Sequence, residues 1–452
     1  MAVTLWCETA MLQSGWVQHV RLTIDGGWFT AIETGAQPVS GDVRCRVAVP
    51  GLPNLHSHAF QRGMAGLAET AGPGEDSFWS WRDTMYRFVA RIGPDDLLAI
   101  AAMAQVEMLE GGFTRVGEFH YLHHDCDGGA FDDPAEMAAA VARASGETGI
   151  GLTLLPVFYA TGGFGGAATG PGQRRFVTDP DGYARLIEAS RIAVGSFPDS
   201  VVGIAPHSLR AVTPEMLGEI MPLAVDGPIH IHAAEQRREV ADCLAWSGQR
   251  PVEWLLNHAP VDARWCLVHA THMTAEETGA LAASGAVAGL CPITEANLGD
   301  GIFPAVDYLA AGGAIGVGSD SNVRIDAAEE LRLLEYGQRL RDEGRNRLAG
   351  GAGRSTGARL YRAALAGGAQ ALGVDGGLAI GASADIVTLD ADHPSLVARS
   401  GDALIDGLVF GDGRAAIHQV WRHGRLVVDR GRHVARDAIA ARFGTTMRRL
   451  LA

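Results

Sequence analysis

The sequence contains no lysine, so all 37 of its lysine-plus-arginine residues are arginine. A chain without lysine cannot form a Schiff base with a carbonyl substrate, and it cannot bind phosphate through the lysine of a P-loop. It also cannot bridge two metal ions with a carboxylated lysine. The absence therefore excludes three mechanisms, whatever the cause of the arginine bias.

Paired cysteines and long apolar stretches are missing as well. No apolar stretch reaches the roughly 18–20 residues that span a bilayer, and Met1–Leu5 has no basic segment typical of a secretory signal. The cysteines are scattered without a C-x-x-C pair, which favours reduced thiols. We therefore expect a cytoplasmic protein with no membrane partner. The cysteines are Cys7, Cys45, Cys126, Cys243, Cys266 and Cys291.

Positive charge is in deficit, and the formal net charge is −15. Nucleic-acid binding needs a basic face, so this balance argues against a nucleic-acid partner. An anionic substrate would need local arginine residues within an otherwise negative field.

Both ends of the chain have the pattern of short strands. Val20–Ile32 contains an Asp-Gly-Gly turn between two apolar runs, which predicts a hairpin. Ala384–Leu389 and Gln419–Val428 have the same character near the C-terminus. We predict a small β-sandwich domain that is built from residues 1–48 and 378–452.

Residues 49–377 alternate between apolar, strand-like runs and helical stretches. Strands that alternate with helices imply a parallel sheet, and eight such units predict an α/β fold of the closed (β/α)8 TIM-like barrel type. The eight runs are Arg46–Pro50, Thr114–Phe119, Gly151–Phe158, Val201–Ala205, Pro228–His232, Trp265–His269, Gly285–Leu290 and Ala314–Val317. Helical patterns are found at Asp95–Glu110, Pro134–Thr148, Pro180–Ala193, Thr213–Met221, Arg238–Trp246 and Thr274–Ala283, and beyond the barrel at Asp429–Leu451.

Histidine and acidic residues follow four of these runs. His56 and His58 come after the first run, and residues two apart in a strand point to the same face, so both can chelate one ion. The fifth run leads into His230–Glu235, the sixth into Val268–His272 and the eighth into Gly318–Asn322. An H-x-H pair alone is a weak signal, but four strand ends that meet at one barrel mouth predict a metal site.

The order of these motifs resembles the amidohydrolase superfamily, and within it the mononuclear deaminase-like branch. The resemblance covers nearly the whole chain and implies one divalent metal ion, expected to be zinc. Its ligands would be His56, His58, His232 and Asp320. A binuclear site bridged by Glu118 is a weaker alternative. The other zinc-deaminase pattern, which ends in P-C-x-x-C, is absent, and Cys291-Pro292 is better interpreted as a loop fixed by proline.

The resemblance also implies catalytic roles for three residues. A divalent ion lowers the pKa of water bound to it, so the expected reaction is hydrolysis at a carbon that bears nitrogen. Asp320 would accept the water proton, and His269 would hydrogen-bond to the same water or to the tetrahedral centre. Glu235 would protonate the leaving nitrogen. Its structural alternative is an ion pair with Arg237 or Arg238.

Several segments resemble one family within this branch, the formimidoylglutamate deiminases. The resemblance implies conversion of N-formimino-L-glutamate and water to N-formyl-L-glutamate and ammonia, in histidine degradation. It also implies a homodimer. The segments are His56–Arg62, Ser77–Tyr86, Pro206–Arg210, Ser319–Arg324 and Glu329–Asn346.

A small dicarboxylate substrate needs cationic partners, and arginine offers a planar fork that matches a carboxylate. The candidates are Arg210, after the fourth run, and Arg82, within the tryptophan-rich segment Ala71–Arg87, which we interpret as a lid. Arg82 has a structural alternative, an ion pair with Asp83 or Asp76. Further substrate contacts are expected from Gln61, Tyr121 and His207.

Three other interpretations remain open. A deaminase of guanine or of an adenosine derivative would favour aromatic stacking and amide groups over paired arginines. A barrel without activity is disfavoured, because the four candidate ligands, Glu235 and His269 are all present. A purely structural zinc site is disfavoured too, because three histidines and one aspartate at a barrel mouth leave room for water.

Overall fold

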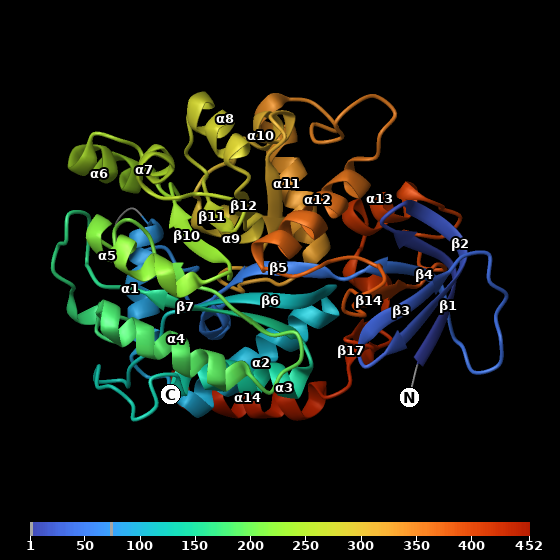
Figure 1. Cartoon of the computed structure of the whole chain (residues 1–452), viewed down its shortest axis with the longest axis horizontal. Helices are drawn as coiled ribbons and strands as arrows, with labels where there is room; N and C mark the ends of the chain where they lie inside the picture. Colours follow the sequence, from blue (N-terminus) through green and yellow to red (C-terminus); the bar gives the residue numbers. More distant parts are fainter. Residues whose placement is uncertain (1–2, 73–75) are drawn as a thin grey trace.

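The computed structural model describes residues 3–72 and 76–452, which form a mixed α/β structure (Figure 1). A sheet built from both ends of the chain lies on one side, and parallel strands with surrounding helices make up the other. Within the described residues, no helix has the length and apolar character needed to cross a membrane. All six cysteines are free thiols.

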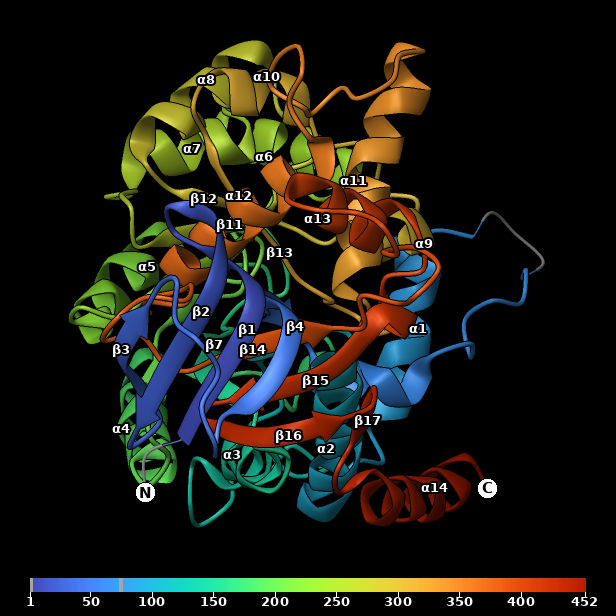
Figure 2. The same ribbon diagram turned by 90° about the vertical axis from the view of Figure 1, so that its right-hand side faces the viewer.

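The two ends of the chain form one eight-stranded sheet, in the order β17-β16-β15-β14-β4-β1-β2-β3 (Figure 2). The predicted hairpin is confirmed, since β2 and β3 pair with Asp25 opposite Trp28. Trp28 also bridges to Ser383, just before β14, so the sheet curls back on itself. All eight strands lie in one hydrogen-bonded sheet, and the predicted two-sheet sandwich is not confirmed. The strands are β1 (Val3–Leu12), β2 (Gly15–Asp25), β3 (Trp28–Glu33), β4 (Val43–Pro50), β14 (Ile386–Leu389), β15 (Ile417–Arg422), β16 (Arg425–Asp429) and β17 (Arg432–His433).

The chain passes from this sheet into the parallel strands at Gly51. The prediction that Arg46–Pro50 is the first barrel strand is wrong, because these residues belong to β4, which pairs with β1 and β14. A Cβ atom at residue 51 would lie 2.1 Å from the Thr114 side chain, so the close approach of the two sheets requires glycine at this position. The first parallel strand is β5 (Leu52–Ser57), which pairs with β6.

Two sheets of parallel strands follow. One joins β5, β6, β7 and β8, with β9 also on β7, and the other joins β10, β11, β12 and β13. Each of the seven remaining predicted runs overlaps at least one of these strands. The strands are β6 (Phe113–His120), β7 (Gly151–Phe158), β8 (Val201–Val202), β9 (Ala205–Pro206), β10 (Ile229–Ala233), β11 (Trp265–His269), β12 (Val287–Leu290) and β13 (Ala314–Val317).

Isolated parallel bridges link the edges of these two sheets. Ile204, between β8 and β9, pairs with Ile229 of β10, and Ser57 of β5 pairs with Asp320 beyond β13. The regular ladders themselves do not continue across these edges. The continuous pairing therefore establishes an α/β fold with two parallel sheets.

Helices alternate with the parallel strands along the chain. The six helices expected in this region are present, and their ends agree with the prediction to within two residues. The helical C-terminal segment is α14, which packs against α2 through the ion pairs Arg436–Glu110 and Arg449–Asp96 (Figure 1). The helices are α1 (Phe78–Val89), α2 (Pro94–Glu110), α3 (Glu136–Thr148), α4 (Pro180–Val194), α5 (Pro214–Ile220), α6 (Arg237–Ser247), α7 (Pro251–His258), α8 (Ala275–Ser284), α9 (Pro292–Leu298), α10 (Ala305–Ala310), α11 (Ala327–Asp342), α12 (Thr356–Ala371), α13 (Asp402–Phe410) and α14 (Arg436–Leu451).

Candidate metal centre

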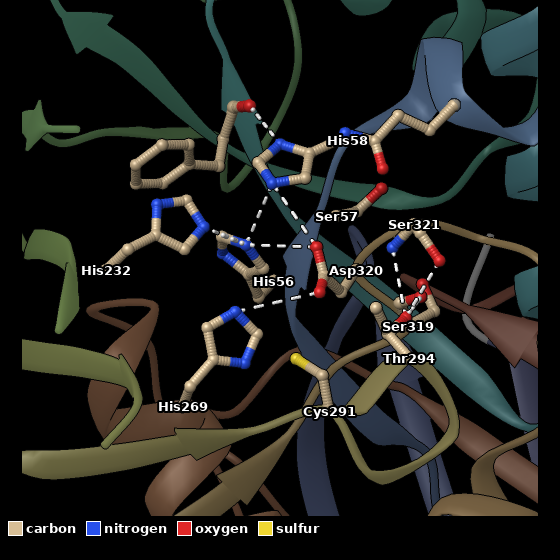
Figure 3. A network of polar contacts seen from close by, with 12 residues as sticks. His56, Ser57, His58, His232, His269, Cys291, Thr294, Ser319, Asp320 and Ser321 are labelled. Atoms are coloured by element: carbon tan, nitrogen blue, oxygen red, sulfur yellow. Dashed lines mark hydrogen bonds and ion pairs between the residues drawn. The ribbon is translucent and has the colours of Figure 1, made fainter. Parts of the chain in front are cut away.

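Three histidines from two strands bring their ring nitrogens together (Figure 3). His56 lies in β5 and His58 directly follows it, so their side chains face the same way. The Nε2 atoms of these two residues are 3.2 Å apart, and Nε2 of His232 in β10 lies 3.1 Å from Nε2 of His56. All three side chains are buried. This group of nitrogens fits a single metal ion.

Backbone carbonyls orient two of the rings. Nδ1 of His58 lies 2.9 Å from the Phe119 oxygen, and Nδ1 of His232 lies 3.0 Å from the His207 oxygen. A carbonyl oxygen can only accept, so each Nδ1 donates a proton and leaves Nε2 free to bind an ion. Burial lowers the pKa of His56 to about 3, and it also lowers the pKa of His58 and of His232. Burial thus favours the neutral imidazoles that bind metals.

Asp320 reaches the same group from the segment after β13. Its N–H donates to the His56 oxygen at 2.9 Å, and its own carbonyl accepts the His58 N–H at 2.9 Å. Its Oδ1 lies 3.5 Å from Nε2 of His56 and 3.3 Å from Nε2 of His58. Burial raises the pKa of Asp320, but the neighbouring histidines, His56 first, outweigh it and hold the pKa below its usual range. An ionised carboxylate beside three imidazoles is a donor set that suits zinc.

His269 lies on the other side of Asp320, at the end of β11. Its Nε2 is 3.8 Å from Oδ2 of Asp320 and 3.8 Å from Oε1 of Glu235, and its Nδ1 is 3.3 Å from Oε1 of Glu295. Burial lowers the pKa of His269, but these three carboxylates outweigh it and raise the pKa to about 10. His269 is therefore placed to exchange protons with its acidic neighbours.

Glu235 is held at the centre by Glu239 of α6. The N–H groups of Ala234 and Glu235 donate to the Glu239 carboxylate at 3.2 and 3.1 Å. Burial raises the pKa of Glu235 to about 7, so its carboxyl can hold or release a proton near neutral pH. Among the described residues, the alternative partners Arg237 and Arg238 form no ion pair with Glu235, whose charged neighbour is the His269 ring.

A cleft of about 600 Å³, open to solvent, leads to these groups. Glu235, His269 and Asp320 line it, and so do all five of the predicted substrate-binding residues. Phe78 and Trp81 of α1 form part of its wall. Part of the predicted lid, residues 73–75, lies outside the described residues. The five are Gln61, Arg82, Tyr121, His207 and Arg210.

Two of these lining residues bring positive charge, and neither forms an ion pair within the described part of the chain. The Nε atoms of Arg82 and Arg210 are buried and have no hydrogen-bond partner among the described residues. The Arg82 guanidinium carbon instead lies 4.5 Å from the Trp79 ring centre, and that of Arg210 lies 6.0 Å from it. The alternative pairing of Arg82 with Asp83 or Asp76 is not observed in the described part of the chain. Half-buried guanidinium groups whose Nε atoms have no partner among the described residues favour an anionic ligand.

The other three lining candidates supply neutral polar groups. Nε2 of Gln61 donates to the Tyr121 hydroxyl at 2.9 Å. Burial raises the pKa of Tyr121 well above its usual value, so the hydroxyl keeps its proton. The His207 ring centre lies 5.8 Å from that of Tyr121, and Nδ1 of His207 lies 3.1 Å from the Ser208 hydroxyl oxygen. The cleft thus combines cations with amide, hydroxyl and imidazole groups.

Three neighbours of the centre were not predicted from the sequence: Glu239, Glu295 and Cys291. Glu295 accepts the Cys291 N–H at 2.9 Å and also faces His269, so it orients both residues. The signal that could have found Cys291 was its position directly after β12, at the strand end where the chemistry of parallel α/β folds gathers. The interpretation of Cys291-Pro292 as only a loop fixed by proline was incomplete.

Glu118 lies outside the groups of close metal-binding atoms found in the described chain. Its carboxyl accepts the Ala59 N–H at 2.7 Å, and burial raises its pKa to about 8. A protonated carboxyl is neutral, and one of its oxygens already accepts a backbone N–H. Such a group is poorly suited to bridge two metal ions. The geometry therefore favours a site without a Glu118 bridge.

Residues 47–427 match the model of the family described as "Amidohydrolase family", and residues 3–45 match "Formimidoylglutamate deiminase HutF, N-terminal domain". Among curated proteins, the chain is 50% identical over 450 residues to a formimidoylglutamate deiminase from Pseudomonas aeruginosa, with 99% of each chain covered.

Solved structures resemble the chain over its whole length. An amidohydrolase from Brucella melitensis is 53% identical, with a TM-score of 0.97 and complete coverage of both chains. An adenosine deaminase from Xanthomonas campestris with bound zinc is 21% identical, with a TM-score of 0.81 over 99% of this chain and 98% of its own. At that identity, the second likeness establishes a shared fold alone.

Proposed function

We propose that this chain, which belongs to the amidohydrolase family, is a formimidoylglutamate deiminase that hydrolyses N-formimino-L-glutamate to N-formyl-L-glutamate and ammonia. The observation that carries the proposal is the 50% identity to the curated deiminase over 99% of both chains. The match of residues 3–45 to the N-terminal domain of the same enzyme supports it. The chain is therefore a metal-dependent hydrolase of a carbon–nitrogen bond, with a place in histidine degradation.

The charge of the cleft agrees with this substrate. N-formimino-L-glutamate carries two carboxylates, and Arg82 and Arg210 offer two guanidinium groups whose Nε atoms have no other partner among the described residues. Gln61, Tyr121 and His207 line the same cleft and supply further hydrogen bonds. A purine ring offers no carboxylate to either arginine, which disfavours the alternative of a guanine or adenosine deaminase.

His56, His58, His232 and Asp320 would hold one divalent metal ion, for which zinc is the natural choice given three imidazoles and a carboxylate. Two observations support the fit. Three Nε2 atoms converge, and the Nδ1–H groups of His58 and His232 donate to backbone carbonyl oxygens, which leaves Nε2 of each ring free. When bound, the ion acts as a Lewis acid and lowers the pKa of water.

The remaining steps belong to side chains of the protein. Asp320, which is ionised, accepts the proton of the attacking water, and His269 donates a hydrogen bond to the same water. The oxygen of this water adds to the formimino carbon. Glu235, 3.8 Å from His269, passes protons to the formimino nitrogen. The carbon–nitrogen bond breaks, the nitrogen leaves as ammonia, and the oxygen stays in the formyl group. Both hydrogens of the water thus end on the ammonia.

We also infer that the two parallel sheets together form the wall of one (β/α)8 barrel, with both chain ends as a separate β domain. Because β4 runs to Pro50, the predicted boundary between residues 48 and 49 moves to Gly51, and the barrel covers residues 51–377. The bridges Ile204–Ile229 and Ser57–Asp320 support the barrel, because they join both pairs of sheet edges. A homodimer and a cytoplasmic location stay predictions.

Ammonia release from N-formimino-L-glutamate by the zinc-loaded protein tests the proposed function. We expect stoichiometric N-formyl-L-glutamate and ammonia, and no release after the metal is stripped. Guanine and adenosine serve as competing substrates in the same assay. Release from a purine, with none from N-formimino-L-glutamate, would overturn the substrate while leaving the metal centre in place.

A further inference from the structure

A second cluster of metal-binding atoms lies beside the three-histidine group, and it contains a sulfur. His269, Cys291 and Asp320 each offer one ligand atom, and these atoms all lie within 4.8 Å of one another. All three side chains are buried. Figure 3 shows the Cys291 sulfur and the His269 ring on one side of Asp320, with His58 on the other.

The two oxygens of Asp320 divide between the two clusters. Oδ1 lies 3.3 Å from Nε2 of His58, whereas Oδ2 lies 3.8 Å from Nε2 of His269. A carboxylate with one oxygen toward each cluster can bridge two neighbouring ions, as in two-metal hydrolytic sites. The second cluster therefore need not take Asp320 away from the first.

An orienting partner is also present, and a further carboxylate lies near one of the ligands. Oε1 of Glu235 lies 3.8 Å from Nε2 of His269, outside the group of three close ligand atoms. Glu295 accepts the Cys291 N–H at 2.9 Å and lies 3.3 Å from Nδ1 of His269, so one buried carboxylate orients both ligands. Partners of this kind raise the metal affinity of the ligands they hold.

The chemistry of these donors selects the ion. Imidazole, thiolate and carboxylate together suit zinc, and the sulfur favours softer, thiophilic ions such as cadmium. The first cluster contains only nitrogen and oxygen donors. A metal–sulfur bond at the centre would therefore report on Cys291 alone.

We propose that His269, Cys291 and Asp320 form a second metal site that takes a thiophilic divalent cation, Cd²⁺ or excess Zn²⁺. Binding forms a metal–sulfur bond and breaks the S–H bond of Cys291, and the proton passes to solvent together with any proton on Nε2 of His269. No oxidation state changes. The ion binds His269 and Asp320, which take part in proton transfer during the hydrolysis, so it inhibits the enzyme. This last consequence rests on the proposed function.

The first test adds Cd²⁺ to protein that already holds one equivalent of zinc. We expect one further ion per chain, proton release, and the ultraviolet charge-transfer band of a cadmium thiolate. Hydrolysis of N-formimino-L-glutamate should be lost over the same range of Cd²⁺ concentration. The thiolate band can be measured without substrate. If the zinc-loaded protein does not hydrolyse N-formimino-L-glutamate before Cd²⁺ is added but still shows the band afterwards, the proposed function is overturned and this site is supported.

The variants Cys291→Ser and Cys243→Ser separate this site from other thiols, since Cys243 is equally buried but lies on α6. We expect Cys291→Ser to keep its basal activity, to lose the band, and to need at least about 10-fold more Cd²⁺ for half inhibition. Cys243→Ser should behave as the unchanged protein. A band or an inhibition curve unaltered in Cys291→Ser would refute the site.

A measurement on the unchanged protein guards against a variant that does not fold. X-ray absorption at the cadmium edge should find one sulfur among the neighbours of the second ion. A shell of nitrogen and oxygen only, in active protein, would overturn the assignment of Cys291.

Discussion

Single polar atoms without a partner determine what the cleft can bind. Oε1 of Gln61 and Nε of Arg82 and of Arg210 are buried and have no hydrogen-bond partner among the described residues. Each such atom costs about 1–3 kcal/mol while it stays unpaired. A ligand that offers carboxylate acceptors and an N–H donor removes this cost, and N-formimino-L-glutamate offers both.

Replacement of Arg210 by glutamine should weaken the recognition of an anionic substrate. The loss of one charge-assisted hydrogen bond costs about 1.5–3 kcal/mol, so kcat/KM for N-formimino-L-glutamate should fall roughly 10- to 100-fold. Ammonia release measures it, with Arg185→Gln, an exposed arginine of α4, as the control. An unaltered kcat/KM in Arg210→Gln would remove this residue from the substrate site.

Glu118 gives a pH-dependent stability. Burial raises its pKa from 4.5 to about 8. Between these pH values the folded protein keeps a proton that the unfolded chain has released, so stability falls as pH rises through this window. Glu118→Gln has no such loss, and it should gain stability relative to the unchanged protein as pH rises, by up to about 5 kcal/mol above pH 8.

Urea unfolding at pH 5 and at pH 8.5 measures this difference. Glu188→Gln, an exposed acid of α4, should follow the unchanged protein at both values. If Glu118→Gln and the unchanged protein show the same pH dependence, then Glu118 is ionised in the folded protein and burial does not raise its pKa.

Among the elements, α1 lines the cleft and also contacts α6. Ser77 caps the helix, with its hydroxyl oxygen accepting the Trp79 N–H at 3.3 Å. The Trp79 ring then lies 4.5 Å from the guanidinium carbon of Arg82 and 4.6 Å from that of Arg238, which belongs to α6. One aromatic ring thus positions an arginine of the cleft and links two helices.

Loss of this ring should loosen Arg82 without unfolding the protein. A cation–π contact is worth about 0.5–2 kcal/mol, so Trp79→Leu should raise KM for N-formimino-L-glutamate about 2- to 30-fold and leave the melting temperature nearly unchanged. Trp28→Leu, a 39% exposed tryptophan in β3, is the control. A KM equal to that of the unchanged protein would show that Trp79 does not position Arg82.

At the scale of the whole molecule, the metal ligands tie together distant parts of the chain. His56 belongs to the first parallel sheet, His232 to the second, and Asp320 follows the last strand of the second. An ion that binds only the folded arrangement stabilises it by mass action, by about 2.7 kcal/mol at 100 times its dissociation constant.

Zinc should therefore raise the melting temperature by a few degrees, and a chelator should reverse the change. His232→Ala should lose the zinc-dependent part of the shift, while His418→Ala, at an exposed position of β15, should keep it. A full zinc shift in His232→Ala would place the stabilising ion elsewhere.

The sequence alone determined the ligands and the proton-transfer residues as candidates. Side-chain alternation is a local property, so His56 and His58 could be assigned to one face before any pairing was known. The rule that chemistry lies at the C-terminal ends of parallel strands brought in His232, His269 and Asp320. Most strands and six helices were predictable for the same reason, since hydrophobic periodicity is also local.

Only the tertiary structure decided which residues meet across the chain. The change of sheet at Gly51 depends on Thr114, and the roles of Glu295 and Cys291 depend on their approach to His269. The absence of ion pairs for Arg82 and Arg210 among the described residues is likewise a property of the whole arrangement. Contacts between residues far apart in sequence are set by packing and strand order, which local patterns do not encode.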